Sequence, residues 1–151
     1  MNPSAYKHLQ VSVEDGGRLV VVELNHGRAN EMGASQVAEW EALTRDLRSG
    51  PARALLTFSR RRSARGTPIF IAGANVTERS DWSPDQVRAH VRWQRATLAS
   101  LRTAPIFHVA VVDGVALGWG TEFLMTSDYR IAGPNASMGL PETGIGIVPG
   151  A

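Results

Sequence analysis

The apolar residues of this chain follow two spacings, one typical of strands and one typical of helices. Near the N-terminus, residues 6–13 alternate loosely between apolar and polar side chains, and residues 18–24 are mostly apolar. Both patterns are typical of strands in a sheet. The intervening Asp15-Gly16-Gly17 is typical of a tight turn. We therefore predict a β-hairpin at the start of the chain.

Two longer segments carry apolar residues at the three- and four-residue spacing of a helix face. The first helix is predicted over residues 33–48, with Ser35 as its N-cap. The second opens at Ser83-Pro84, where serine suits the cap and proline the first helical position, and runs to about Thr103. The expected buried stripes are Val37, Trp40, Leu43, Thr44 and Leu47 on the first helix, and Val87, Val91, Leu98 and Leu101 on the second.

Three further segments are predicted as strands, over residues 53–58, 69–71 and 106–112. The last contains the continuous apolar run Val109–Val112, which suits a strand buried on both faces. Strands that alternate with helices and contain such runs indicate an α/β layered fold. Because no internal repeat or linker divides the chain, we expect a single domain.

The stretch from residue 113 to residue 150 carries the candidate chemistry. After the Asp113-Gly114 turn, a short helix is predicted over residues 117–125, opening at a Gly-Trp-Gly turn, followed by another strand and a loop rich in proline and glycine. The first N–H groups of a helix have no partner inside it, and the helix dipole favours negative charge there. Glu122 lies one turn inside this helix, and Glu142 follows in the loop. The functional interpretation is a site that holds a charged substrate oxygen beside two carboxylates. The alternative is an ordinary tight connection with a carboxylate at a helix start.

The composition narrows the chemistry. The 151 residues include no cysteine, which excludes disulfides, thiolate catalysis and zinc sites built from cysteine. The four histidines show no metal-binding spacing, so we expect no metal. No apolar run approaches the length of about 20 residues that crosses a bilayer, and no secretory signal is visible at the N-terminus. We therefore expect a cytoplasmic protein without a membrane partner.

Residues 59–68 form a polar, basic segment with four arginines. The simplest interpretation is a solvated surface loop, and the alternative is a patch that binds phosphate. No aromatic residue is interleaved with Arg60, Arg61, Arg62 and Arg65, so recognition of nucleic acid by base stacking is not expected.

The order of four sequence motifs resembles the crotonase (enoyl-CoA hydratase/isomerase) superfamily. The motifs are LNHGRAN at 24–30, IFIAGAN at 69–75, VDGVALGWGTE at 112–122 and DYRIAGPNASMGLPETGIGIVPG at 128–150. The resemblance covers the chain from about residue 5 to its end. It implies a β-β-α spiral fold, with residues 1–151 as a single core domain that is truncated before the C-terminal helical region of family members. It also implies a homotrimer or a dimer of trimers for a full-length chain.

The resemblance implies a site that binds acyl-CoA thioesters, with coenzyme A as part of the substrate and no permanently bound cofactor. The backbone N–H groups of Ala74 and Trp119 would form an oxyanion hole, and Glu122 and Glu142 would be the catalytic glutamates. Contacts to the substrate and its coenzyme A are implied for Arg28, Ala29, Ala72, Gly73, Leu117 and Gly118.

Because both glutamates are present, the expected reaction is hydration of a 2-enoyl-CoA to a 3-hydroxyacyl-CoA. The alternatives are another reaction of the same superfamily (isomerisation, thioester hydrolysis or decarboxylation) and an inactive, truncated family member. Two residues depart from the family pattern: Asn75 stands where aspartate is usual, and Trp119 replaces the middle glycine of its turn. The Trp119 indole could fill part of the acyl pocket or stack on an aromatic acyl group, or it could pack outward against a neighbour.

Overall fold

A computed structural model describes residues 1–150 of the chain. Its strands are β1 (Gln10–Glu14), β2 (Leu19–Leu24), β3 (Ala54–Ser59), β4 (Ile69–Ile71), β5 (Phe107–Val112), β6 (Val115–Leu117), β7 (Tyr129–Ala132) and β8 (Ser137–Gly139). Its α-helices are α1 (Ala34–Ser49), α2 (Pro84–Arg102) and α3 (Trp119–Leu124), and its 3-10 segments are η1 (Pro3–Ala5), η2 (Asp15–Gly17), η3 (Thr77–Arg79) and η4 (Pro141–Ile145). No helix among these is long and apolar enough to cross a membrane.

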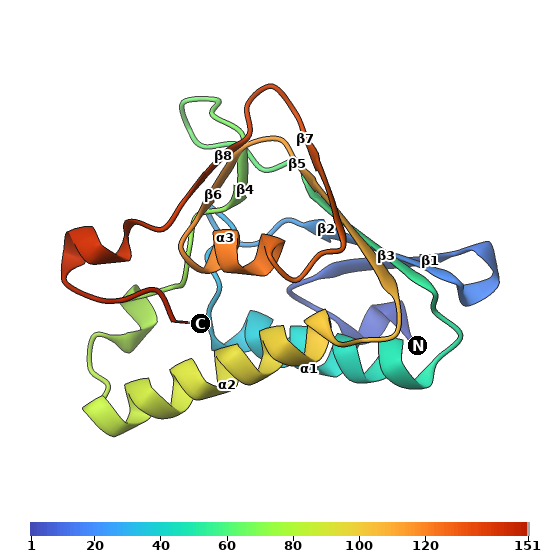
Figure 1. The fold of residues 1–151 in the computed structure, drawn as a ribbon, viewed down its shortest axis with the longest axis horizontal. Helices are drawn as coiled ribbons and strands as arrows, with labels where there is room; N and C mark the ends of the chain where they lie inside the picture. Colours follow the sequence, from blue (N-terminus) through green and yellow to red (C-terminus); the bar gives the residue numbers. More distant parts are fainter. Residues whose placement is uncertain (151) are drawn as a thin grey trace.

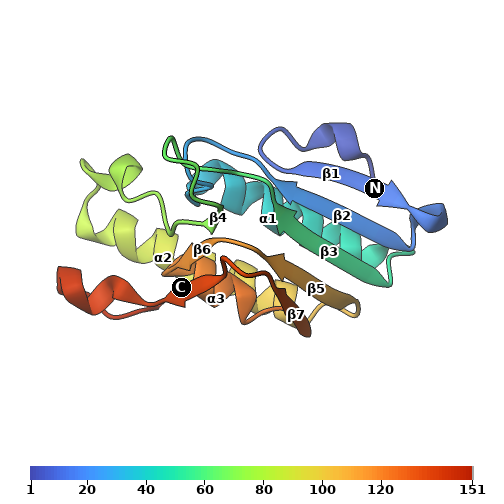
Figure 2. The same ribbon diagram turned by 90° about the horizontal axis from the view of Figure 1, so that it is seen from above.

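The strands form two sheets that meet at an angle (Figure 1). The larger sheet has the order β1-β2-β3-β5-β7, in which only the β1–β2 hairpin is antiparallel. The smaller sheet, β4-β6-β8, is parallel throughout. Helices α1 and α2 pack side by side beneath the sheets, and α3 lies in the angle between them (Figures 1 and 2). This confirms the predicted α/β architecture and the hairpin.

Phe123 of α3 is the point at which the layers meet. Its ring lies 4.8 Å from that of Trp40 on α1, 5.7 Å from that of His108 on β5 and 6.1 Å from that of Phe70 on β4. All four residues are fully or almost fully buried. Because β5, a turn, β6 and α3 follow one another along the chain, this core fixes where the start of α3 sits relative to both sheets.

The turn from β5 into β6 requires glycine. Gly114 has a φ of 147°, and a Cβ there would lie 2.5 Å from the backbone carbon of Pro68. The close approach lets the chain leave the larger sheet and enter the smaller one within two residues. The predicted helix over residues 117–125 is therefore wrong at its start, because residues 115–117 pair with β4 and β8 as strand β6.

The predicted cap of the first helix is also wrong. Helix α1 begins at Ala34, with Gly33 in the N-cap position, so Ser35 lies inside the first turn. The Ala34 N–H donates to both oxygens of Glu78, at 3.0 and 3.1 Å. The carboxylate that caps this helix thus comes from η3, far along the chain, where local sequence gives no indication of it.

Strand β5 is buried on one face rather than on two. His108, Ala110 and Val112 are buried, whereas Val109 and Val111 are only partly buried. The same alternation runs along β2 and β3. The apolar run predicted the strand correctly, but its second face is left partly open by the described part of the chain.

We expect His108 to make the free energy of unfolding depend on pH. Its Nε2 lies 3.0 Å from the Thr57 hydroxyl, and burial lowers its pKa from 6.5 to about 4, against a smaller opposing effect of Asp128. Between these values the unfolded chain binds a proton that the folded chain does not, so unfolding becomes easier as the pH falls. Keeping His108 neutral contributes up to about 3 kcal/mol to the free energy of unfolding. This contribution is fully present above about pH 6.5 and is lost towards about pH 4.

The measurement is urea unfolding of the wild type and of His108→Asn at about pH 7 and about pH 4.5. We expect the wild type to lose more unfolding free energy than the variant between the two conditions. Equal losses in both proteins would show that His108 does not contribute.

Candidate functional site

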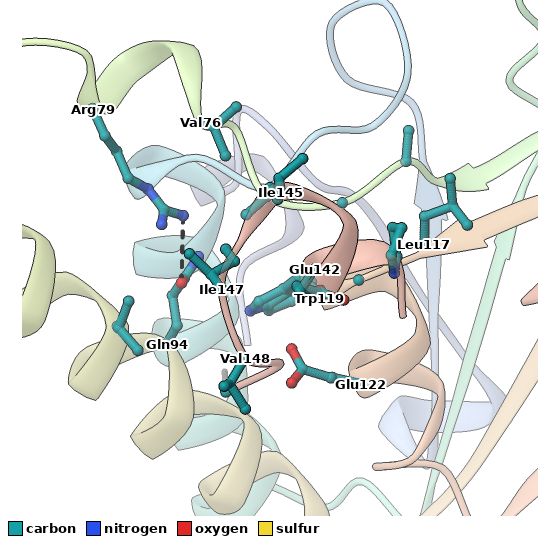
Figure 3. A pocket seen from close by; sticks show the side chains of 17 residues that line it. Val76, Arg79, Gln94, Leu117, Trp119, Glu122, Glu142, Ile145, Ile147 and Val148 are labelled. Atoms are coloured by element: carbon teal, nitrogen blue, oxygen red, sulfur yellow. Dashed lines mark hydrogen bonds between the residues drawn. The ribbon is translucent and has the colours of Figure 1, made fainter. Parts of the chain in front are cut away.

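A cavity of about 320 Å³ opens between helix α2 and three other segments that are distant in sequence from one another. Of these three, one follows β4, one is the turn from β6 into α3, and the third is η4 with the loop after it (Figure 3). The residues that line it are Ala72, Gly73, Ala74, Val76, Arg79, Val91, Gln94, Leu117, Gly118, Trp119, Glu122, Pro141, Glu142, Ile145, Ile147, Val148 and Gly150.

The turn from β6 into α3 brings a free backbone N–H to this cavity. Gly118 has φ 51° and ψ −119°, a conformation that side chains disfavour, and it is the N-cap of α3. Trp119 is the first helical residue, so its N–H has no acceptor within the helix. The preceding N–H, that of Gly118, is paired: it donates to the Gly139 carbonyl at 2.9 Å, and this bond connects the turn to β8.

A second free N–H comes from the segment after β4. Ala74 pairs with Met32 in an isolated parallel bridge, in which the Met32 N–H donates to the Gly73 carbonyl at 2.9 Å and the Asn75 N–H to the Met32 carbonyl at 2.8 Å. This pattern directs the Ala74 N–H away from Met32, and no acceptor within residues 1–150 receives it. Both predicted donors therefore lie at the wall of one cavity without an acceptor from the described chain.

The two glutamates also line this cavity, from different elements (Figure 3). Glu122 lies in the first turn of α3, where its N–H donates to the Gly118 carbonyl at 3.0 Å. Glu142 lies in the first turn of η4, and its carboxylate packs directly against the α-carbon of Gly118. Its Oε2 is buried and has no hydrogen-bond partner in the described structure. The fold thus brings together two carboxylates that are separated in sequence by strands β7 and β8.

Thr121 connects the two segments that contain these glutamates. Its hydroxyl shares its one proton between the carbonyls of Ala116 and Gly139, each 2.8 Å away, and accepts the Gly139 N–H at 3.1 Å. Because only Leu140 lies between Gly139 and η4, Thr121 connects the start of α3 to the segment that leads to Glu142. Sequence reasoning missed this positioning residue, since its partners are set by the pairing of β6 with β8.

The predicted substrate contacts divide into two groups. Four of them, Ala72, Gly73, Leu117 and Gly118, line the cavity. Ala29 lies beside this group, because its carbonyl accepts the Ala72 N–H at 3.1 Å.

Arg28 is exposed and does not line the cavity. Its carbonyl accepts a bond of 3.4 Å from Arg61 Nε, so residues 28–29 lie next to the basic loop. In that loop, Arg61 also donates to Asn25 and Arg62 to the Gly66 carbonyl, whereas Arg60 pairs with Glu23 at 3.3 Å. Any phosphate bound here would therefore compete with contacts that the loop already makes.

Comparison with known proteins decides the family. The model of the enoyl-CoA hydratase/isomerase family matches residues 63–151. The chain belongs to the enoyl-CoA hydratase/isomerase family. It is 42% identical over 83 residues to a probable mitochondrial enoyl-CoA hydratase 2 of Arabidopsis thaliana, covering 55% of this chain and 28% of that protein. It is 30% identical over 139 residues to an enoyl-CoA isomerase/hydratase of Zymoseptoria tritici, covering 89% of this chain and 44% of that protein.

Solved structures of the same family share the fold. The crystal structure of an enoyl-CoA hydratase from Bacillus anthracis superposes with a TM-score of 0.85 at 30% identity, covering 96% of this chain and 55% of that chain. The crotonase fold expected from the motifs is therefore confirmed. The chain spans about half the length of that structure and less than half of the two relatives named above.

Trp119 stands where the family motif usually has glycine. Its side chain faces inward. Its side chain is 2% exposed, stacks on Phe123 at 5.6 Å and lines the cavity. The alternative that it packs outward is wrong, because the start of α3 lies between the two sheets. Asn75, the other departure, is half-buried and binds Met32 through its backbone N–H.

Two polar residues that sequence reasoning missed also line the cavity of this family member. Arg79 lies on η3, and burial lowers its pKa. Gln94 lies on α2, is 1% exposed and accepts a bond of 3.4 Å from Arg79 Nη2. A signal for Gln94 existed, because it falls on the predicted stripe between Val91 and Leu98. No comparable pattern marks Arg79.

Proposed function

We propose that this protein hydrates a 2-enoyl-CoA to a 3-hydroxyacyl-CoA. One observation carries the proposal: Glu122, Glu142 and the N–H groups of Ala74 and Trp119 border the same cavity. Membership of the enoyl-CoA hydratase/isomerase family supports an acyl-CoA thioester as the ligand. Coenzyme A enters as part of the substrate.

The chemistry requires both pairs of groups. When a water oxygen bonds to C3, the electrons of the double bond move toward the thioester, and its oxygen becomes an enolate oxygen. Two preorganised N–H donors stabilise that charge, with about 3–4 kcal/mol lost when one such donor is removed from other enzymes. One glutamate takes the proton from the attacking water, and the other, as the carboxylic acid, delivers a proton to C2.

The test of this function is the loss of conjugated-thioester absorbance on adding the protein to crotonyl-CoA or cinnamoyl-CoA. Decay of the absorbance, with the 3-hydroxyacyl product identified by mass spectrometry, is the expected result. Binding of both thioesters without water addition would contradict the proposal and direct attention to isomerisation, hydrolysis or decarboxylation. Cinnamoyl-CoA also reports whether the cavity beside Trp119 accepts an aromatic ring.

Arg28 is assigned to the nucleotide end of coenzyme A, outside the reacting cavity. Replacing Arg28 with alanine should raise KM by roughly 3- to 10-fold and leave kcat nearly unchanged, because an exposed charge contact is worth about 1 kcal/mol. Initial rates over a range of crotonyl-CoA concentrations separate the two constants. Arg92→Ala, an exposed arginine on α2, is the matched control. A reduced kcat in Arg28→Ala with an unchanged KM would contradict this role.

A further inference from the structure

Asn30 is a buried polar residue whose side chain joins three strands. It is 1% exposed. Its Nδ2 lies 3.2 Å from the Leu24 carbonyl at the end of β2, 3.0 Å from the Ser59 hydroxyl at the end of β3 and 2.8 Å from the Phe70 carbonyl in β4. Because the amide has two N–H hydrogens, these three acceptors share them. One side chain thus connects the larger sheet to the smaller one.

The same residue closes the loop over residues 26–30. Its Oδ1 accepts the His26 N–H at 2.8 Å, and its own backbone N–H donates to the His26 carbonyl at 3.0 Å. Its φ is 54°, in the left-handed region, where asparagine is favoured among residues other than glycine. The side chain and the backbone of Asn30 together therefore fix where the chain leaves this loop.

The residues on either side of Asn30 hold the segment that carries the Ala74 donor. The Ala72 N–H donates to the Ala29 carbonyl at 3.1 Å, and Met32 bonds to the peptide groups on both sides of Ala74. The position of this segment therefore depends on the path of the chain through Asn30.

One of these bonds sets the direction of the donor. The Gly73 carbonyl and the Ala74 N–H belong to the same peptide group, which is planar and trans, so they point in opposite directions. The Met32 N–H donates to that carbonyl at 2.9 Å, and the Ala74 N–H is thereby turned away from Met32 at the wall of the cavity. Gly73 has a φ of 115°, which gives this peptide group a freedom that other residues would deny it. Its orientation therefore depends on the bond from Met32.

We propose that Asn30 is a positioning residue, which holds the Ala74 N–H in the direction that the thioester oxygen requires. It acts through Met32, two residues further along the chain, and through the Phe70 carbonyl in the strand that leads to the donor. The proposal rests on the function proposed above, in which this N–H stabilises the enolate oxygen. The alternative is that Asn30 only closes the loop that presents Arg28.

The direct measurement is the infrared stretch of a bound thioester carbonyl. Butanoyl-CoA labelled with carbon-13 at that carbonyl is the probe, because it has no double bond to hydrate. Two N–H donors draw electrons towards the oxygen and lower the stretching frequency below its value in solution. Asn30→Gly permits the same φ and removes the side chain, so we expect its frequency to move back towards the solution value. A wild-type protein without a lowered frequency, or an Asn30→Gly variant with the wild-type frequency, would overturn the proposal.

Steady-state rates distinguish positioning of the donor from positioning of Arg28. A misplaced oxyanion donor should lower kcat for crotonyl-CoA by roughly 10- to 100-fold, because the charge on the oxygen develops only in the transition state. The dissociation constant of butanoyl-CoA should change by only a few-fold. A raised KM with an unchanged kcat, the result expected of Arg28→Ala, would show that Asn30 acts only on the loop and would overturn the proposal.

Two further variants distinguish an effect on the donor from a general loss of stability. Ser59→Ala removes one acceptor of the Asn30 amide, together with the bond of 2.6 Å from the serine hydroxyl to the Ile69 carbonyl, and should cause a smaller change of the same kind. Thr57→Val is the control, since Thr57 is as deeply buried and its hydroxyl lies 3.0 Å from His108 Nε2. It should lower the urea midpoint and keep the wild-type frequency and kcat.

These variants also decide the remaining cases. Where Asn30→Gly does not fold, an unchanged frequency in Ser59→Ala overturns the proposal. A frequency change in Thr57→Val as large as that in Asn30→Gly does so too, because the change would then follow stability rather than the position of the donor.

The outcome for hydration is read separately. A lowered frequency that Asn30→Gly loses, in a protein that hydrates neither crotonyl-CoA nor cinnamoyl-CoA, would support the positioning role and contradict the hydratase function. Hydration by the wild type, with equal frequencies in the wild type and Asn30→Gly, would support the function and overturn the positioning role.

Discussion

Glutamine in place of either Glu122 or Glu142 is expected to lower kcat for crotonyl-CoA hydration by roughly 100- to 10,000-fold, the range that general acid–base catalysis contributes. The amide cannot take a proton from water and cannot deliver one to C2. The side-chain volume is almost unchanged, so the cavity and the backbone donors stay in place. Binding of the saturated butanoyl-CoA should therefore change by only a few-fold.

Measuring the stability of each variant distinguishes a loss of catalysis from a loss of folded protein. The Oε2 of Glu142 is buried without a partner, so Glu142→Gln breaks no hydrogen bond at that atom and should not lower the urea midpoint. Glu14→Gln, on an exposed residue of β1, controls for the loss of one negative charge. Turnover within a few-fold of the wild type in either Glu122→Gln or Glu142→Gln would rule out the two-carboxylate mechanism.

Local pattern predicted most of the fold, because its main elements are set by spacings that lie within one segment. The hairpin follows from alternation around a glycine turn, and α2 begins where Ser83 caps it, with the Gln86 N–H donating to the serine hydroxyl at 3.3 Å. The errors occur where a distant segment decides. Glu78 rather than Ser35 caps α1, and the pairing of β6 with β4 and β8 converts a predicted helix start into a strand.

The candidate site likewise has parts that local sequence predicted and parts that it did not. The motifs identified both glutamates and both backbone donors, and the fold brings these four groups to one cavity. Arg79 was beyond sequence reasoning, because it reaches the cavity only through the placement of η3. A polar residue on an otherwise apolar helix stripe, as Gln94 is, marks a position at which a cavity rather than a core is to be expected.

Alanine at Gly118 is expected to abolish most activity, because this residue meets two independent constraints. Its φ of 51° and ψ of −119° favour glycine, and a Cβ would clash with a carboxylate oxygen of Glu142. The backbone strain should cost about 1–3 kcal/mol of unfolding free energy. The displaced carboxylate and the shifted Trp119 N–H should together lower kcat/KM by roughly 100-fold or more, since removing one oxyanion donor alone costs that much in other enzymes.

The Gly66→Ala variant distinguishes the effect of backbone strain from the effect of displacing the Glu142 carboxylate. Gly66 also has a positive φ, 81°, but nothing lies within 4 Å of the position that its Cβ would take. Its alanine variant should lose stability to a similar degree and keep its turnover of crotonyl-CoA. Urea unfolding and steady-state rates of both variants complete the comparison. If Gly118→Ala retained turnover comparable to that of Gly66→Ala, the carboxylate of Glu142 would not need the position that it occupies against the Gly118 α-carbon, and its assignment to proton transfer would fail.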